Sequence, residues 1–363
     1  MPGRPGSVGR GVMASRPTVS LASLFLIACA SSPQPAGPAR SDPAGAARSP
    51  APRSPDAETQ AARAAAAAGL RGLAERGEVE RAGVVVLDPR SGRLLAAVGL
   101  GPEGDAEPFR SAPTGSTFKA VTIAAALDAG LDPARRFPGA ALDGVRDWRP
   151  EPWQDARTTL VRSSNVGATH IFDAVGGAPL GAAATALGFD RTWRVGERET
   201  DPPAFPSDWL GAPGRDAAAH GGEASLVHLA VAFGALANDG ERVAPTLAGG
   251  GEHERVVSPE AAARTMAFLA DATGPEGTGA RAASPALRVA GKTGTAHLGE
   301  GPERRWVALF VGAAPAEEAR WVVAVRVIGR AEASGGAVAA PVFRDVVEHL
   351  RRSSAASQGG AAG

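Results

Sequence analysis

Tyrosine is missing from this chain of 363 residues, so a mechanism that needs a phenol is excluded. The single cysteine, Cys29, excludes a disulfide framework and a zinc site built from several cysteines. Basic and acidic residues balance at 38 each, which leaves no basic footprint for binding nucleic acid. The chain is nevertheless 44% hydrophobic, which is too apolar for a disordered protein and sufficient for a large core.

Lysine and asparagine are also scarce. Lys119 and Lys292 are the only lysines among the 38 basic residues, and Asn165 and Asn238 are the only asparagines. Because the composition is otherwise pushed toward Arg, Ala, Gly and Pro, each lysine and asparagine is informative. Asn238 is adequately explained as a helix end, whereas the other three lie in the motifs described below.

The first 28 residues predict an export signal. Arg4, Arg10 and Arg16 precede an apolar run, residues 17–28, which is too short to span a hydrocarbon core of about 30 Å. The run ends at Cys29 and resembles a bacterial lipobox, whose cysteine carries the lipid; a plain signal peptide with a chance cysteine is the alternative. We therefore expect an exported, periplasmic or extracytoplasmic protein that Cys29 anchors to a membrane, inner or outer.

The rest of the chain divides by composition. Residues 29–58 are mostly Ser, Pro, Ala and Gly and cannot bury enough apolar area to fold, so they predict a flexible tether. Residues 353–363 predict a disordered tail for the same reason. Residues 59–352 remain as the folded body.

Hydrophobic periodicity in the body predicts an α/β fold. Helices are expected at residues 60–76, 116–129, 165–175, 224–237, 259–269 and 342–351. Strands are expected at residues 84–87, 93–98, 287–296, 306–311 and 321–328, the last buried on both faces. Since the strands lie at both ends of the body, we expect one sheet built from both ends beside a mostly helical lobe.

The first motif is Ser116-Thr117-Phe118-Lys119, at the start of a predicted helix. Residues three apart share a helix face, so Ser116 Oγ and Lys119 Nζ can meet. A serine hydroxyl needs a base to become a good nucleophile, and a neutral lysine can be that base, whereas arginine cannot lose its proton. An ordinary surface serine and lysine are the alternative, because this spacing is common by chance.

The second motif is Ser163-Ser164-Asn165, before the helix 165–175. Ser163 and Asn165 can both point into one cleft, where a hydroxyl can relay a proton and an amide can orient a substrate carbonyl or a lysine. A helix N-cap is the alternative, since Ser and Asn are favoured there.

The third motif is Gly291-Lys292-Thr293-Gly294-Thr295, within the predicted strand 287–296. Glycine permits the close approach of a ligand, and Lys292 with the hydroxyls of Thr293 and Thr295 would form a cationic rail for a carboxylate. An exposed edge strand with a solubilising lysine is the alternative.

Taken together and in this order, the three motifs use both lysines and one of the two asparagines. The pattern resembles the penicillin-recognising serine enzymes: penicillin-binding transpeptidases, DD-carboxypeptidases and serine β-lactamases. The segments 83–96, 159–167 and 224–245 resemble the transpeptidase domain as well. The resemblance implies a five-stranded antiparallel sheet beside a helical lobe and makes residues 59–352 a transpeptidase-like catalytic domain.

The resemblance also implies a mechanism on D-Ala-D-Ala stem peptides of peptidoglycan. Ser116 would form the acyl-enzyme, Lys119 would be its base with a pKa lowered by the charge of Lys292, and Ser163 and Asn165 would relay a proton and orient substrate. Lys292, Thr293, Gly294 and Thr295 would bind the terminal carboxylate. The backbone N–H groups of Ser116 and Thr295 would stabilise the oxyanion.

The same resemblance implies that no metal or organic cofactor takes part and that β-lactams acylate the same serine. A DD-carboxypeptidase and a class D-like serine β-lactamase remain alternatives. Asn165 favours the transpeptidase, because that β-lactamase class has an apolar residue there. A non-catalytic lipoprotein that binds cell-wall fragments or β-lactams is the alternative of another class. Trp148 and Trp153, in a Pro-rich loop between the first two motifs, could wall a substrate groove, but packing is the favoured expectation. His297 is expected at the rim of the cleft.

Overall fold

The computed structural model describes residues 56–75 and 79–359. The predicted signal peptide, the lipid-attachment residue Cys29 and nearly all of the predicted tether lie outside these residues. None of the described helices is both long enough and apolar enough to cross a membrane.

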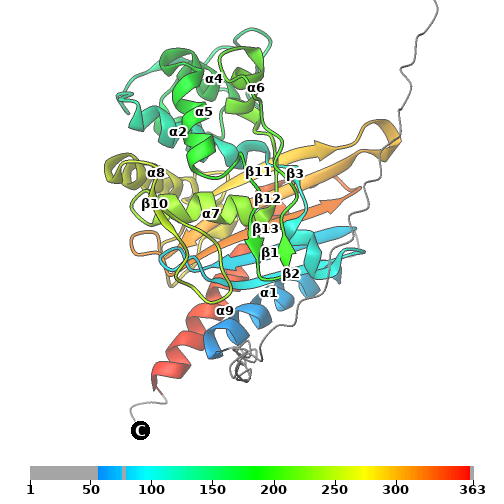
Figure 1. Ribbon diagram of the computed structural model, residues 1–363. Coiled ribbons are helices and arrows are strands. Elements are labelled where there is room, and N and C mark those ends of the chain that lie inside the picture. Colours follow the sequence, from blue (N-terminus) through cyan, green and yellow to red (C-terminus); the bar gives the residue numbers. More distant parts are fainter. Residues whose placement is uncertain (1–55, 76–78, 360–363) are drawn as a thin grey trace, which may run out of the picture. The chain divides into compact units, whose positions relative to one another are not determined.

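A five-stranded antiparallel sheet forms the centre of the fold (Figure 1). Its spatial order is β11 (Ala290–Leu298), β12 (Arg305–Ala314), β13 (Trp321–Gly329), β1 (Arg81–Leu87) and β2 (Leu94–Leu100). Val84 of β1 pairs with Val325 of β13, which joins the two ends of the chain. The expected sheet is thus confirmed, including the burial of all nine residues of β13.

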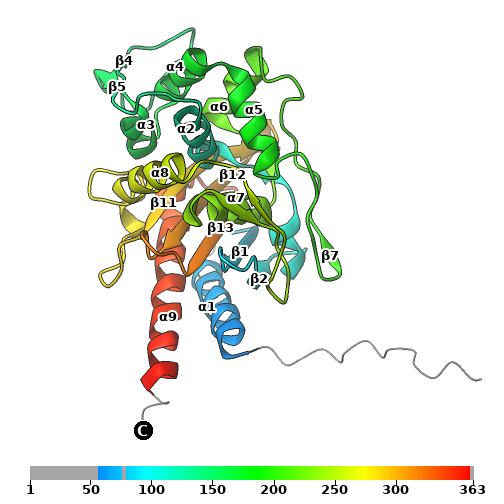
Figure 2. The same cartoon turned by 60° about the vertical axis from the view of Figure 1, so that its left-hand side comes forward.

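One face of the sheet is covered by the first and last helices, α1 (Ala57–Ala74) and α9 (Ala340–Gly359), which lie side by side (Figures 1 and 2). Because side chains alternate along a strand, Val84 and Val86 of β1 pack toward these helices. Val85 and Leu87 belong to the core on the opposite face.

The opposite face carries the helical lobe (Figure 2). Its helices are α2 (Lys119–Asp128), α3 (Ala156–Arg162), α4 (Asn165–Val175), α5 (Gly177–Ala186), α6 (Ala212–His220), α7 (Leu226–Ala237) and α8 (Pro259–Ala272). Short paired strands connect them: β3 (Ala112–Pro113) with β8 (Glu223–Ala224), β4 (Phe137–Pro138) with β5 (Trp153–Gln154), β6 (Arg194–Val195) with β7 (Arg198–Glu199), and β9 (Glu241–Val243) with β10 (His253–Arg255). The helix α7 is almost entirely buried and contacts β13, β1 and β12, so it joins the lobe to the sheet.

Two sequence predictions are corrected at the ends of the body. The first helix begins at Ala57 rather than residue 60, because the carboxylate of Asp56 accepts a hydrogen bond from the Thr59 backbone and caps it. The final helix continues through Gly359, so the expected disordered tail is helical over residues 353–359. Ser, Ala and Gln in this stretch tolerate helix, and no proline interrupts it.

Candidate active site

The serine of the first motif lies in a tight turn. Gly115–Phe118 forms a 3₁₀ turn, and Lys119 begins α2 directly after it. Gly115 has φ +52°, and a Cβ there would lie 2.9 Å from the Thr295 carbonyl, so only glycine fits. The fully buried Lys119 places its Nζ 2.7 Å from Ser116 Oγ. The predicted contact between Ser116 Oγ and Lys119 Nζ is therefore observed.

The second motif lies at the junction of two helices. Ser163 ends α3 in a left-handed conformation, with φ +60°, and Ser164 Oγ caps α4 by accepting from Gly167 N at 2.8 Å. Capping is therefore the role of the middle serine, and the residues on either side face Lys119. Its Nζ lies 2.6 Å from Asn165 Oδ1 and 3.2 Å from the Ser163 carbonyl oxygen.

The third motif occupies the edge strand β11. Lys292 is fully buried, and its Nζ donates to Ser163 Oγ at 2.8 Å and to the Thr293 carbonyl at 3.1 Å. A Cβ on Gly294 would lie 2.9 Å from the Thr114 carbonyl, so glycine lets β11 approach the segment that carries Ser116. The alternative of an exposed, solubilising lysine is thereby excluded.

The pKa values of the two lysines are lowered by a different main cause than expected. Burial lowers the pKa of Lys119 to about 7, and the carboxylate of Asp147 acts in the opposite direction. Burial, followed by the positive charge of Lys119, holds the pKa of Lys292 well below its usual range. The expectation that the charge of Lys292 lowers the pKa of Lys119 is corrected, because desolvation is the main cause.

Asp147 is a site residue that the sequence analysis missed. Its carboxylate accepts hydrogen bonds from Ser164 Oγ at 2.5 Å, from Asn165 N at 2.6 Å and from Val166 N at 3.1 Å. A carboxylate at a helix N-terminus is favourable. Asp147 therefore fixes the start of α4 and, with it, the amide that faces Lys119. Its place in an irregular loop gave no periodic signal.

Residues of all three motifs line one groove of about 750 Å³. Ser116, Ser163, Asn165, Thr293 and Thr295 line it, whereas Lys119, Lys292 and Gly294 lie behind its surface. Lys292 is thus hydrogen-bonded to a serine rather than exposed as part of a cationic rail. The hydroxyl of Thr293 lies 2.8 Å from that of Thr278, and the hydroxyl of Thr295 accepts from Gly335 N at 3.2 Å.

The positions expected for two tryptophans and for His297 can be compared with the structure around the groove. Trp148 is 86% exposed and Trp153 is 53% exposed, so the favoured expectation of packing is wrong for both. Trp148 lines the groove, in agreement with the alternative, whereas Trp153 does not. His297 lies exposed against Trp306, with ring centroids 4.2 Å apart, and Trp306 lines the groove. This agrees with a rim position for His297.

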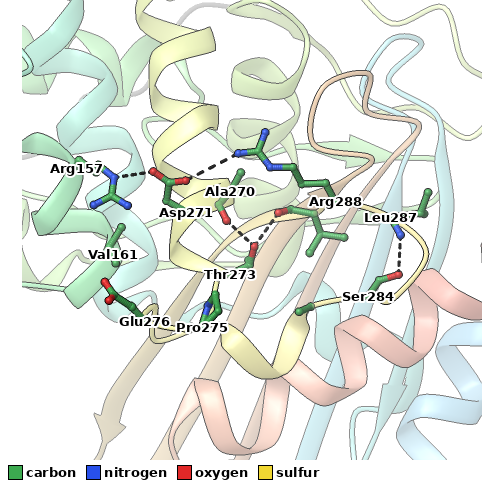
Figure 3. A pocket seen from close by; sticks show the side chains of 13 residues that line it. Arg157, Val161, Ala270, Asp271, Thr273, Pro275, Glu276, Ser284, Leu287 and Arg288 are labelled. Atoms are coloured by element: carbon green, nitrogen blue, oxygen red, sulfur yellow. Dashed lines mark hydrogen bonds and ion pairs between the residues drawn. The ribbon is translucent and has the colours of Figure 1, made fainter.

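A second pocket, of about 440 Å³, lies beside α3 and α8 (Figure 3). At its centre Asp271 accepts a hydrogen bond from Arg157 at 2.6 Å and lies 3.9 Å from Arg288. Ser284 donates to Glu348 and has no lysine beside it in this lining. The lysine–serine chemistry is therefore confined to the groove that contains Ser116.

The profile of the family described as "Penicillin binding protein transpeptidase domain" matches residues 82–348. The chain belongs to this family. Among curated relatives of this penicillin-binding family, it is 30% identical over 320 residues to penicillin-binding protein PbpB of Mycolicibacterium smegmatis, covering 73% of this chain and 49% of PbpB. It is 28% identical to the peptidoglycan D,D-transpeptidase PbpA of Mycobacterium tuberculosis, covering 74% of this chain and 66% of PbpA.

Two solved structures resemble this penicillin-binding domain. The apo transpeptidase domain of Burkholderia pseudomallei penicillin-binding protein 3 has a TM-score of 0.75 and 27% identity, over 84% of this chain and 97% of that one. A protein described as a peptidoglycan glycosyltransferase from Burkholderia ambifaria has a TM-score of 0.73 and 28% identity, over 81% and 96%. Within residues 56–75 and 79–359, no cluster of three His, Cys, Asp or Glu side chains could hold a metal ion.

Proposed function

We propose that this protein is a penicillin-binding serine DD-transpeptidase, which forms an acyl-enzyme on Ser116 from D-Ala-D-Ala stem peptides of peptidoglycan. The observation that carries the proposal is the 2.7 Å approach of a fully buried lysine amine, Lys119 Nζ, to Ser116 Oγ. The relatives named as peptidoglycan D,D-transpeptidases support the reaction.

A neutral Lys119 accounts for every contact of its amine. A neutral amine has two N–H donors and one lone pair. The donors satisfy Asn165 Oδ1 and the Ser163 carbonyl, and the lone pair then accepts the Ser116 hydroxyl proton. The pKa of about 7 supplies a large neutral fraction near neutral pH, which suits a general base.

Substrate binding uses the sheet side of the groove. The hydroxyls of Thr293 and Thr295 receive the terminal carboxylate, while Lys292 holds Ser163 from behind by donating a hydrogen bond to its Oγ. The backbone N–H groups of Ser116 and Thr295 bind the developing oxyanion. The close packing of Gly115 against the backbone of Thr295 supports this pairing, because it holds the two segments together.

The reaction then follows from these positions. Ser116 Oγ attacks the carbonyl carbon of the penultimate D-Ala as its proton passes to Lys119. The peptide bond breaks, and the terminal D-Ala leaves with a proton that Ser163 relays to its amine. The acyl group passes to the amine of a neighbouring stem peptide, which forms a cross-link, and a proton of that amine returns to Ser116 Oγ. Transfer of the acyl group to water would make the enzyme a carboxypeptidase instead.

Export belongs to the same proposal. Residues 1–28 direct the chain out of the cytoplasm, Cys29 carries the lipid, and the Pro-rich tether lets residues 59–352 reach the cell wall. Intact protein from membranes should carry a lipid mass on Cys29. An unmodified Cys29 in such protein, or a C29A variant that remains membrane-bound, contradicts the anchor.

Fluorescent penicillin labelling tests the acyl-enzyme. Wild-type protein should be labelled on Ser116 and S116A should not; normal labelling of S116A rejects the assignment. Mass spectrometry of muropeptides after incubation with the enzyme tests the acceptor. Cross-linked dimers support transpeptidation, whereas trimmed monomers alone indicate hydrolysis.

A further inference from the structure

Trp148 leaves a large apolar surface uncovered in the groove that holds Ser116. It lies in the loop between β4 and β5, is 86% exposed and lines the groove. The groove volume of about 750 Å³ is in the range that holds drug-sized ligands, so a terminal dipeptide fills only part of it. The space beside Trp148 is therefore available to a second part of the substrate.

The loop that carries Trp148 is anchored through the preceding residue, Asp147. Asp147 is held by hydrogen bonds from Ser164 Oγ, Asn165 N and Val166 N, which anchor the loop to the start of α4. The guanidinium of Arg149 lies 4.7 Å from the centre of the Trp148 ring. The loop is thus anchored beside the motif Ser163-Ser164-Asn165, and the Arg149 guanidinium, a hydrogen-bond donor, lies over the indole ring.

The opposite wall of the groove provides a contrast. Trp306 is half-buried, with the His297 ring 4.2 Å from its own and the Arg304 guanidinium 5.4 Å away. Its surface is largely occupied by the protein. Trp148 remains mostly open, so it is the tryptophan of the groove that can receive a ligand.

The charges around Trp148 favour a neutral ligand rich in hydrogen-bond acceptors. Asp147 accepts from four donors, Gln154 Nε2 at 3.5 Å included, and Glu151 and Glu276 lie 2.9 Å and 3.9 Å from Arg162. Glu332 also lines the groove, but Arg149, Arg162 and Arg281 line it as well, and the charge beside the indole itself is that of Arg149, which disfavours an ammonium group there. A pyranose ring offers an apolar C–H face for the indole, together with hydroxyl and acetamido oxygens for Arg149.

We propose that Trp148 and Arg149 form a binding site for an N-acetylated sugar ring of the peptidoglycan glycan strand. This site rests on the proposed function, because it supposes that stem peptides reach Ser116 while attached to glycan. It would place the stem peptide in the groove by holding the sugar to which the peptide is linked.

Binding of a β-1,4-linked tetramer of N-acetylglucosamine tests the sugar site without any peptide. Titration calorimetry should give W148A an affinity about tenfold weaker than wild type, the scale expected for loss of an aromatic contact. W153A is the matched control, since Trp153 is exposed near the same loop but does not line the groove, and it should bind as wild type does. Equal binding by W148A and wild type, or no binding by wild type, overturns the proposal.

A kinetic comparison tests the link to the reaction. The ratio of KM for a disaccharide-pentapeptide to KM for the free pentapeptide should rise about tenfold in W148A and partly recover in W148F. An unchanged ratio means that Trp148 contacts peptide or nothing, and overturns the proposal. If wild-type Ser116 is not labelled by penicillin, the proposed function fails, whereas the tetrasaccharide titration still reports on the sugar site.

Discussion

Lys119 and Lys292 are the two lysines of this protein, and both are fully buried beside a serine hydroxyl. Lys119 contacts Ser116 Oγ, Asn165 Oδ1 and a carbonyl oxygen, whereas Lys292 contacts Ser163 Oγ and a carbonyl oxygen. The carboxylate of Asp147 acts on the pKa of Lys119, while the charge of Lys119 acts on that of Lys292. Similar burial thus leaves the two amines with different partners, and the proposed mechanism makes Lys119 the base for Ser116 and Lys292 the support of Ser163.

The largest effect should come from removing the amine that faces Ser116. In K119R the guanidinium cannot accept a proton, so the second-order rate constant of penicillin acylation should fall by about 10²- to 10⁴-fold. Stopped-flow measurement with a fluorescent penicillin gives this constant. Because arginine stays protonated, an active K119R would show that Lys119 is not the base.

A smaller loss is expected for the second lysine. K292M leaves Ser163 Oγ without its hydrogen-bond donor, so acylation should fall by roughly 10²-fold, the lower end for a proton-transfer group. The same stopped-flow assay applies. A loss in K292M that equals or exceeds the loss in K119R would remove the distinction between the two lysines.

The next largest loss of acylation rate is expected for a substitution of Asn165. In N165A the buried amine loses the acceptor at 2.6 Å, and a buried group left without its partner costs about 1–3 kcal/mol, or roughly ten- to a hundredfold in acylation rate. N238A is the matched control, because Asn238 bonds the Glu241 carbonyl at the end of α7. If both variants lose activity equally, a general loss of stability explains the result.

Asp147 should have the smallest effect, on the pH profile rather than the maximal rate. Its carboxylate raises the pKa of Lys119, so D147N should move the acid limb of acylation to lower pH. S164A removes a hydrogen bond to Asp147 without changing its charge, and its limb should remain in place. A limb that moves upward in D147N would contradict the electrostatic role.

Local spacing explains how much of this could be predicted. The i, i+3 spacing fixed the pairing of Ser116 with Lys119, and apolar periodicity placed α4 at residues 165–175, as observed. Asp147 could not be found in the same way, because it lies 18 residues from Asn165 in an irregular loop. The exposure of Trp148 also depends on that loop, and composition alone favours packing for a tryptophan.

The pH dependence of wild-type penicillin acylation most directly tests whether Lys119 is the neutral base. A pKa of about 7 predicts a rate constant that rises about tenfold per pH unit on the acid side and levels off above neutrality. The plateau should be lost in K119R. A wild-type profile that is flat through neutrality, or that rises only near the ordinary pKa of lysine, would contradict the account.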